Sequence, residues 1–91
     1  MSSNGKIDIL SSFDKKTITT LNSYLSNHGL RPSCTKTDCE YILNVKFEYL
    51  QKAIELSAEY INKKKLEVFC CGLVYWCKYA PGFIGGINKE V

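Results

Sequence analysis

The chain's densest group of potentially reactive side chains lies in LEVFCCGLVYWCKYAPG, residues 66–82, where Cys70, Cys71 and Cys77 fall within eight positions. A thiolate can bind a metal, act as a nucleophile or enter a disulfide, depending on its surroundings. The neighbours here are mostly apolar, and free cysteines in apolar surroundings behave as small hydrophobic residues. We therefore predict that Cys70 and Cys77 pack in the protein core.

A zinc site is the alternative for the cysteines. Cys34 and Cys39 lie in a polar stretch and could supply two thiolates, while Cys70 with Cys77, or the single histidine His28, could complete four ligands. Structural zinc sites usually combine two matched pairs of closely spaced ligands, and the second pair is missing here. The sequence thus predicts no metal and no other cofactor.

No complete catalytic signature is present either. His28 precedes Gly29 at the expected end of a helix, and nothing in the sequence orients it against a cysteine as a nucleophile–base pair. Gly82, Gly85 and Gly86 follow the last apolar segment and precede no helix pattern, whereas a phosphate-binding loop needs a strand before the glycines and a helix after them. We predict that the protein is not an enzyme and has no catalytic residues.

Size and composition restrict the remaining classes. The 91 residues suffice for one domain, and 45% of them are hydrophobic, which is enough to build a core. The net charge of +3 is mild, Arg31 is the single arginine, and Lys63–Lys65, the densest basic run, is typical of a solvated helix end or turn. Binding to nucleic acid is therefore disfavoured.

The cellular compartment is predicted from the cysteines and from the apolar segments. Five cysteines cannot all pair within one chain, which argues against disulfides. The longest apolar stretch, residues 68–77, is too short to cross a bilayer as a helix, and the first residues lack the apolar run of a signal peptide. We expect an intracellular protein, cytoplasmic or nuclear, without membrane contact.

The first half of the chain predicts a strand, a helix and a loop. Residues 6–10, KIDIL, are typical of a short strand. Ile18, Leu21 and Leu25 then form the stripe of a helix that ends near Asn27 before Gly29, and Ser11 with Asp14 has the spacing of a capping box before it. Residues 30–40 are predicted to be a loop because they contain Pro32 and several Thr, Ser and Asp residues.

The second half predicts two more helices. An amphipathic helix ending near Lys63 is indicated by the apolar positions Leu43, Phe47, Leu50, Ile54 and Ile61. Its start stays open, because residues 40–45 could instead be a short strand before a helix that begins near Lys46. A last helix over residues 66–79 is favoured over a strand, with Leu66, Phe69, Cys70, Leu73, Trp76 and Cys77 on one stripe.

Together these elements predict an α+β domain dominated by helices, with one or more short N-terminal strands and about three helices. An all-α three-helix bundle is the alternative. The domain is expected to span residues 1–81, and residues 82–91 a flexible, glycine-rich tail in which Phe83, Ile84 and Ile87 could dock on a surface.

Four segments resemble the BTB/POZ superfamily, in particular its cullin adaptors of the elongin C and Skp type. KIDILSS is similar to the opening strand of that family and TITTLNSYLSNHG to its early helix. ILNVKFEYLQKAIELSAEYINKK resembles the short strand and following helix, and LEVFCCGLVYWC the closing helix of elongin C. The connector before the closing helix is shorter here than in elongin C.

The resemblance implies a BTB/POZ-like fold and an adaptor in a ubiquitin-ligase-type complex. Such an adaptor would pair with a ubiquitin-like subunit, contact a cullin and present a hydrophobic groove to a partner helix. By position, the groove residues would be Leu56, Leu66, Val68, Cys70, Gly72, Val74 and Cys77.

Other interpretations remain open at this point. A small viral or mobile-element protein that binds and inhibits a host protein fits the compact length and the content of Lys and Asn. A zinc-stabilised module that binds nucleic acid through Lys63–Lys65 is a second alternative. The sequence does not settle the oligomeric state, and a homodimer is one option.

Overall fold

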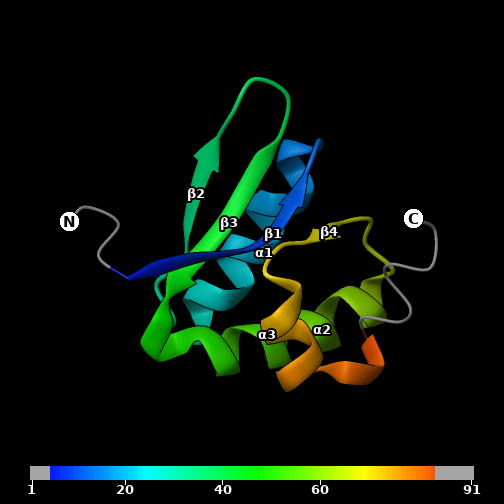
Figure 1. The fold of residues 1–91 in the computed structure, drawn as a ribbon. Coiled ribbons are helices and arrows are strands. Elements are labelled where there is room, and N and C mark those ends of the chain that lie inside the picture. The colour runs from blue at the N-terminus through cyan, green and yellow to red at the C-terminus, as the bar shows by residue number, and fades with distance from the viewer. Residues whose placement is uncertain (1–4, 84–91) are drawn as a thin grey trace.

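A computed structural model describes residues 5–83 and shows a four-stranded antiparallel sheet with helices packed against one face (Figure 1). Along the chain the elements are β1 (Lys6–Ser12), α1 (Lys15–Asn27), β2 (Ser33–Lys36), β3 (Tyr41–Lys46), the 3-10 turn η1 (Phe47–Tyr49), α2 (Leu50–Lys64), β4 (Phe69–Cys70) and α3 (Leu73–Tyr79). The predicted α+β class is confirmed. The three-helix bundle is wrong, because residues 41–46 form a strand.

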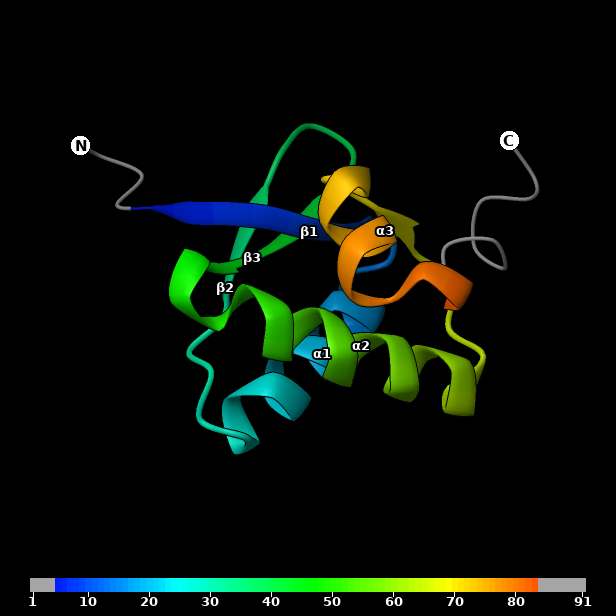
Figure 2. The ribbon, with the colours of Figure 1, turned by 60° about the horizontal axis from the view of Figure 1, so that its bottom comes forward.

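The strand order is β2-β3-β1-β4, so that β1 and β3 are the central strands. Helix α1 connects β1 to β2 and helix α2 connects β3 to β4, which gives the β-α-β-β-α-β order of a split β-α-β unit. Helix α3 follows as an additional element. It packs on α2 beside β1, where β4 is too short to cover the edge of the sheet (Figure 2).

A bulge in β1 connects α3 to the sheet. The register of β1 and β3 shifts between Asp8 and Leu10, which leaves Ile9 outside the regular pairing. The carbonyl oxygen of Ile9 accepts hydrogen bonds from the indole Nε1 of Trp76, at 2.9 Å, and from the backbone N–H of Cys71, also at 2.9 Å. Trp76 is fully buried, so this bond fixes the position of α3.

Helix α1 has the predicted apolar face and C-terminal end, but a different cap. Ile18, Leu21 and Leu25 are fully buried, and the helix ends at Asn27 before Gly29, whose φ is +78°. The N-cap is Asp14, whose carboxylate accepts from the N–H of Lys16; the predicted capping by Ser11 is wrong. Ser11 is instead the penultimate residue of β1, where its backbone is part of the sheet.

The predicted loop over residues 30–40 contains the strand β2, so that prediction is wrong. β2 pairs with β3 from Ser33 opposite Asn44 to Lys36 opposite Tyr41, and a turn closed by Thr37 and Glu40 joins them. β2 is an edge strand with mostly exposed side chains. It therefore lacks the apolar alternation from which strands are identified in a sequence.

Helix α2 begins later than its apolar pattern indicates. Leu43 lies on β3 and Phe47 on η1, although both continue the helical spacing of Leu50 and Ile54. The end agrees with the prediction: α2 ends at Lys64, and the left-handed cap is Lys65, with φ of 54°. Lys63–Lys65 are all exposed at this helix end, as the sequence indicates.

The predicted helix over residues 66–79 is present only from Leu73. Phe69 and Cys70 form β4 against Ser11 and Leu10 of β1. Gly72 then adopts φ of 62°, and a Cβ there would lie 3.1 Å from Cδ2 of Tyr75. This left-handed turn separates the strand from the helix, which ends at Tyr79 before Pro81 as expected.

One core lies between the sheet and the helices. It contains Ile9, Leu10, Ile18, Leu21, Leu25, Leu30, Leu43, Val45, Leu50, Ala53, Ile54, Ile61, Val68 and Trp76. Within residues 5–83, no helix is long and apolar enough to cross a membrane. The tail predicted for residues 82–91 lies outside the described residues from position 84 onward.

Candidate functional site

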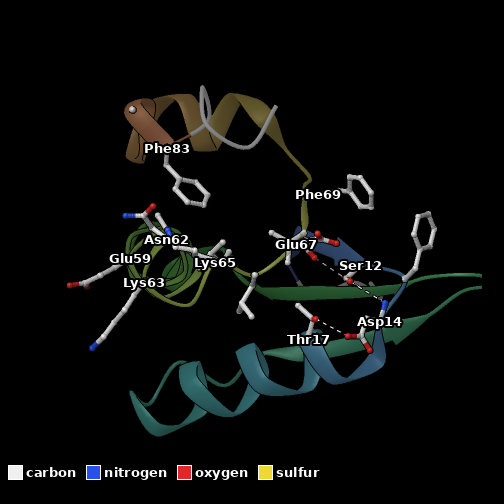
Figure 3. Close-up of a pocket in the computed structure, with 16 residues that line it drawn as sticks. Ser12, Asp14, Thr17, Glu59, Asn62, Lys63, Lys65, Glu67, Phe69 and Phe83 are labelled. Atoms are coloured by element: carbon white, nitrogen blue, oxygen red, sulfur yellow. Dashed lines mark hydrogen bonds between the residues drawn. The ribbon is translucent and has the colours of Figure 1, made fainter. Parts of the chain in front are cut away.

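An open groove of about 1150 Å³ lies between the start of α1, the C-terminal half of α2, the connector to β4 and the segment after α3 (Figure 3). Its walls therefore come from four parts of the chain that are distant in sequence. The lining residues are Ser12, Phe13, Asp14, Thr17, Ala58, Glu59, Ile61, Asn62, Lys63, Lys65, Leu66, Glu67, Val68, Phe69, Gly82 and Phe83.

A pair of exposed phenylalanines marks one side of the groove. Phe13 is 61% exposed and Phe69 is 51% exposed, and their rings meet edge to face with centroids 5.5 Å apart. Phe13 directly follows β1 and Phe69 lies on β4, whose pairing with β1 brings the two rings together. Large aromatic side chains left in water are unfavourable unless something covers them.

The opposite side is closed by Phe83. Its ring stacks on Trp76, with centroids 5.4 Å apart and an angle of 28° between the planes. Figure 3 shows the Phe83 side chain reaching from the segment after α3 toward the end of α2. The half-buried Leu66 adds aliphatic surface between these walls, and the core residues Ile61 and Val68 line the groove with little exposed surface. The apolar part of the groove is thus anchored to the buried Trp76.

Hydrogen bonds hold the rim at the start of α1. The hydroxyl of Ser12 accepts from the backbone N–H of Asp14 at 3.0 Å and donates to the carbonyl of Glu67 at 3.5 Å. Asp14 accepts in turn from the Thr17 hydroxyl at 3.1 Å. The Ser12–Glu67 bond connects the end of β1 with the connector before β4, and the bonds of Asp14 hold the start of α1 beside it, so these parts of the lining are joined.

The charges around the groove are mixed. Asp14, Glu59 and Glu67 are acidic, whereas Lys63 and Lys65 are basic. Side chains of both signs therefore line the same groove. A polyanion such as nucleic acid would meet carboxylates along this rim, while a peptide with charges of both signs would not be repelled.

The structure separates the seven residues expected to form a groove. Leu66 and Val68 line the groove described above. Val74 is 70% exposed on α3, and Cys77 is exposed there as well. The others lie outside the lining: Leu56 and Cys70 are half-buried, and Gly72 forms the turn before α3.

The core position predicted for Cys77 is wrong. The prediction assumed one helix from residue 66, which would place Cys70 and Cys77 on the same side. The turn at Gly72 interrupts this helix. Cys70 is therefore half-buried on β4, while Cys77 is exposed on α3. The sequence did not identify the pair Phe13 and Phe69, because only the pairing of β4 with β1 makes them neighbours.

A second set of exposed apolar side chains, here called the α3 surface, consists of Phe47, Leu73 and Val74 together with the half-buried Tyr75. Phe47 and Tyr75 meet edge to face at 6.5 Å, and Phe47, Leu73 and Val74 are 59%, 47% and 70% exposed. Val74, one of the seven residues expected to form a groove, belongs to this α3 surface. It contributes nothing to the lining of the groove, so the two surfaces can be tested separately.

All five cysteines are free thiols, and Cys34, Cys39 and Cys77 are exposed. Burial, with a smaller contribution from the neighbouring Cys71, raises the pKa of the Cys70 thiol to about 12. Burial also raises the pKa of Cys71, although a hydrogen bond with Ser11 acts in the opposite direction. These two thiols are therefore protonated at neutral pH and are weak nucleophiles and metal ligands.

Within residues 5–83, no three side chains of His, Cys, Asp or Glu lie close enough to bind a metal together. His28 is exposed at the end of α1, where its Nδ1 lies 2.9 Å from the carbonyl oxygen of Tyr24 and its ring contacts that of Tyr24. It therefore lies at the opposite end of α1 from Asp14 and Thr17, which line the groove.

Comparisons with protein families, with curated proteins and with solved structures give no match for this chain.

Proposed function

We propose that the protein is a non-enzymatic interaction module that binds a short apolar segment of a partner protein in the groove. The observation that carries the proposal is the exposed pair Phe13 and Phe69 in the lining of a groove that also contains the half-buried Leu66 and Phe83. Aromatic side chains beside a concave apolar surface are the usual anchors of protein interfaces.

The chemistry of the lining supports a peptide as the ligand. An amphipathic helix or extended segment could insert two or three apolar side chains between Phe69 and Phe83. Its polar side could then meet Glu59 and Glu67, or Lys63 and Lys65, at the rim. Nucleic acid is disfavoured as a ligand by the three carboxylates among these charges.

A finer version of the proposal is an elongin C-like adaptor in a ubiquitin-ligase-type complex, with a ubiquitin-like subunit and a cullin as partners. It is based on the sequence resemblance to BTB/POZ adaptors. Leu66 and Val68 belong both to the groove residues implied by that resemblance and to the groove of this structure. An intracellular location is part of the same proposal.

The test is a pull-down with the tagged chain from its native cell extract, read by mass spectrometry. We compare the wild type with the double variant Phe13→Ser, Phe69→Ser and with the single variant Phe47→Ser. Phe47 is the matched control, because it is a phenylalanine of similar exposure that lies on the α3 surface. Circular dichroism establishes that each variant is folded.

We expect the partner to be lost with the double variant and retained with Phe47→Ser. Loss with Phe47→Ser alone would place the binding site on the α3 surface and contradict the groove proposal. A cullin or a ubiquitin-like subunit among the proteins that depend on the groove would support the adaptor version. One unrelated protein in near-equal amount would instead favour the inhibitor of a host protein.

A further inference from the structure

The groove ends where the described chain ends. Gly82 and Phe83 are both part of its lining, and Phe83 is the last residue that the structure describes. Eight residues follow, with the sequence IGGINKEV. The C-terminal segment, residues 84–91, is thus attached directly to the groove wall.

We propose that, in the protein without a partner, this C-terminal segment occupies the groove of its own chain. Eight residues can extend at most about 27 Å, which is comparable to the 34 Å longest dimension of the protein. Their point of attachment is one wall of the groove, so the opposite wall is within this reach. Gly85 and Gly86 allow the chain to reverse its direction directly after Phe83.

The side chains of the segment match the lining in kind. Ile84, Ile87 and Val91 are apolar, like the aliphatic and aromatic part of the lining, and polar residues lie between Ile87 and Val91. Lys89 can meet a carboxylate such as Glu67, and Glu90 can meet a lysine of the rim. Covering Phe69 and Phe83 would remove apolar surface from water, which is the main driving force.

Attachment to the groove wall compensates for the small size of the segment. A tethered ligand acts at an effective concentration in the millimolar range, so contacts too weak for a free peptide are sufficient. A second copy of the chain at micromolar concentration would have to bind far more tightly to compete. This difference favours the chain's own segment as the occupant.

The consequence is competition between the segment and a partner for the same surface. That regulatory role rests on the function proposed above, whereas the docking of the segment rests on the groove and the sequence alone. The experiment therefore measures docking in the isolated full-length protein, where no partner is needed.

The test is NMR spectroscopy of the isotopically labelled full chain, with NOEs measured between the methyl groups of Ile84 or Ile87 and the side chains of Val68 and Phe69. The variant Ile84→Ser, Ile87→Ser removes both apolar anchors. Asn88→Ser is the matched control, because it changes a polar side chain of the same segment. The amide shifts of Thr17, Ala58 and Asn62 report on the lining.

We expect NOEs from the segment to the lining in the wild type, and shift changes at the lining that are larger for the double variant than for Asn88→Ser. Absence of these NOEs, or equal effects of the two variants, would overturn the proposal. NOEs only between differently labelled copies in a mixed sample would also overturn it, because the occupant would then be a second chain. If docking of the segment were overturned in either way, capture of a partner through the groove in the pull-down would still support the proposed function.

Discussion

A single backbone carbonyl determines much of the geometry around the groove. The bulge in β1 frees the oxygen of Ile9 from the ladder, and the indole of Trp76 uses it as an acceptor. Trp76 in turn provides the surface on which Phe83 stacks. The position of the groove wall is therefore set by a residue that itself lies outside the groove.

The Cys70 thiol gives the folded state a measurable dependence on pH. Its pKa is about 12 in the folded protein, compared with an ordinary value of 9.0, and the main cause is burial. Below pH 9 the thiol is protonated in both the folded and the unfolded state, and its contribution to the free energy of unfolding is fully present. Between pH 9 and 12 the unfolded chain loses this proton while the folded chain retains it. The free energy of unfolding should therefore fall as the pH rises through this window.

The measurement is urea unfolding between pH 8 and 11, with wild type and Cys70→Ala compared in parallel. Tyrosines and lysines titrate in the same range, so the decisive quantity is the difference between the two slopes. We expect the decline to be steeper for the wild type. Parallel curves would show that Cys70 is not desolvated in the folded protein.

The two glycines that end helix α1 and begin helix α3 permit a matched comparison. Both have positive φ, +78° at Gly29 and +62° at Gly72, but a Cβ meets nothing within 4 Å at Gly29 and lies 3.1 Å from Tyr75 at Gly72. Gly29→Ala should cost about 1–2 kcal/mol from backbone strain. Gly72→Ala should cost more, because the ring of Tyr75 must also move. Equal losses in denaturant unfolding would contradict the close approach at Gly72.

At the scale of elements, the sequence predicted those parts of the fold that depend on residues close together in the chain. The end of α1 follows from Gly29, and its core face from Ile18, Leu21 and Leu25. β2 could not be predicted, since it is held by backbone bonds to β3 and has no apolar face of its own. The same applies to β4, whose pairing with β1 bridges almost sixty positions of sequence.

The C-terminal cap of α2 provides a test of helix termination. Lys65 adopts the left-handed conformation, with φ of 54°, and the N–H of Leu66 bonds back to the carbonyl of Ile61 at 3.2 Å. Glycine is the preferred residue at this position, so Lys65→Gly should stabilise the protein by about 0.5–1 kcal/mol. The control Lys64→Gly lies inside the helix and should destabilise it by a similar amount.

Urea unfolding of both variants at moderate salt measures these two effects, which are expected to have opposite signs. Each variant loses one lysine charge, and the salt screens the effect of that loss on stability. A loss of stability in both variants would mean that α2 continues past Lys64 instead of ending in a left-handed cap.

At the scale of the whole molecule, the sequence predicted the α+β class and a content of apolar residues sufficient for the core. It could not predict the groove, because its walls are brought together by β4 and by the stack of Phe83 on Trp76. Leu66 and Val68 were identified through the resemblance to BTB/POZ adaptors. The same resemblance implies Val74 and Cys77 as groove residues, but the turn at Gly72 begins a separate helix, α3, on which both are exposed.

The reactivity of the five cysteines tests the fold as a whole. Cys34 and Cys39 belong to the hairpin of β2 and β3 and Cys77 to α3, and all three are exposed. Cys70 and Cys71 are half-buried beside β1, and their pKa values are raised. Because disulfide reagents react with accessible thiolates, three equivalents should be modified rapidly at pH 8 and two slowly. In denaturant all five should react at one rate. Mass spectrometry of the partly modified protein identifies the slow pair; rapid modification of Cys70 would show that β4 is not paired with β1 in solution.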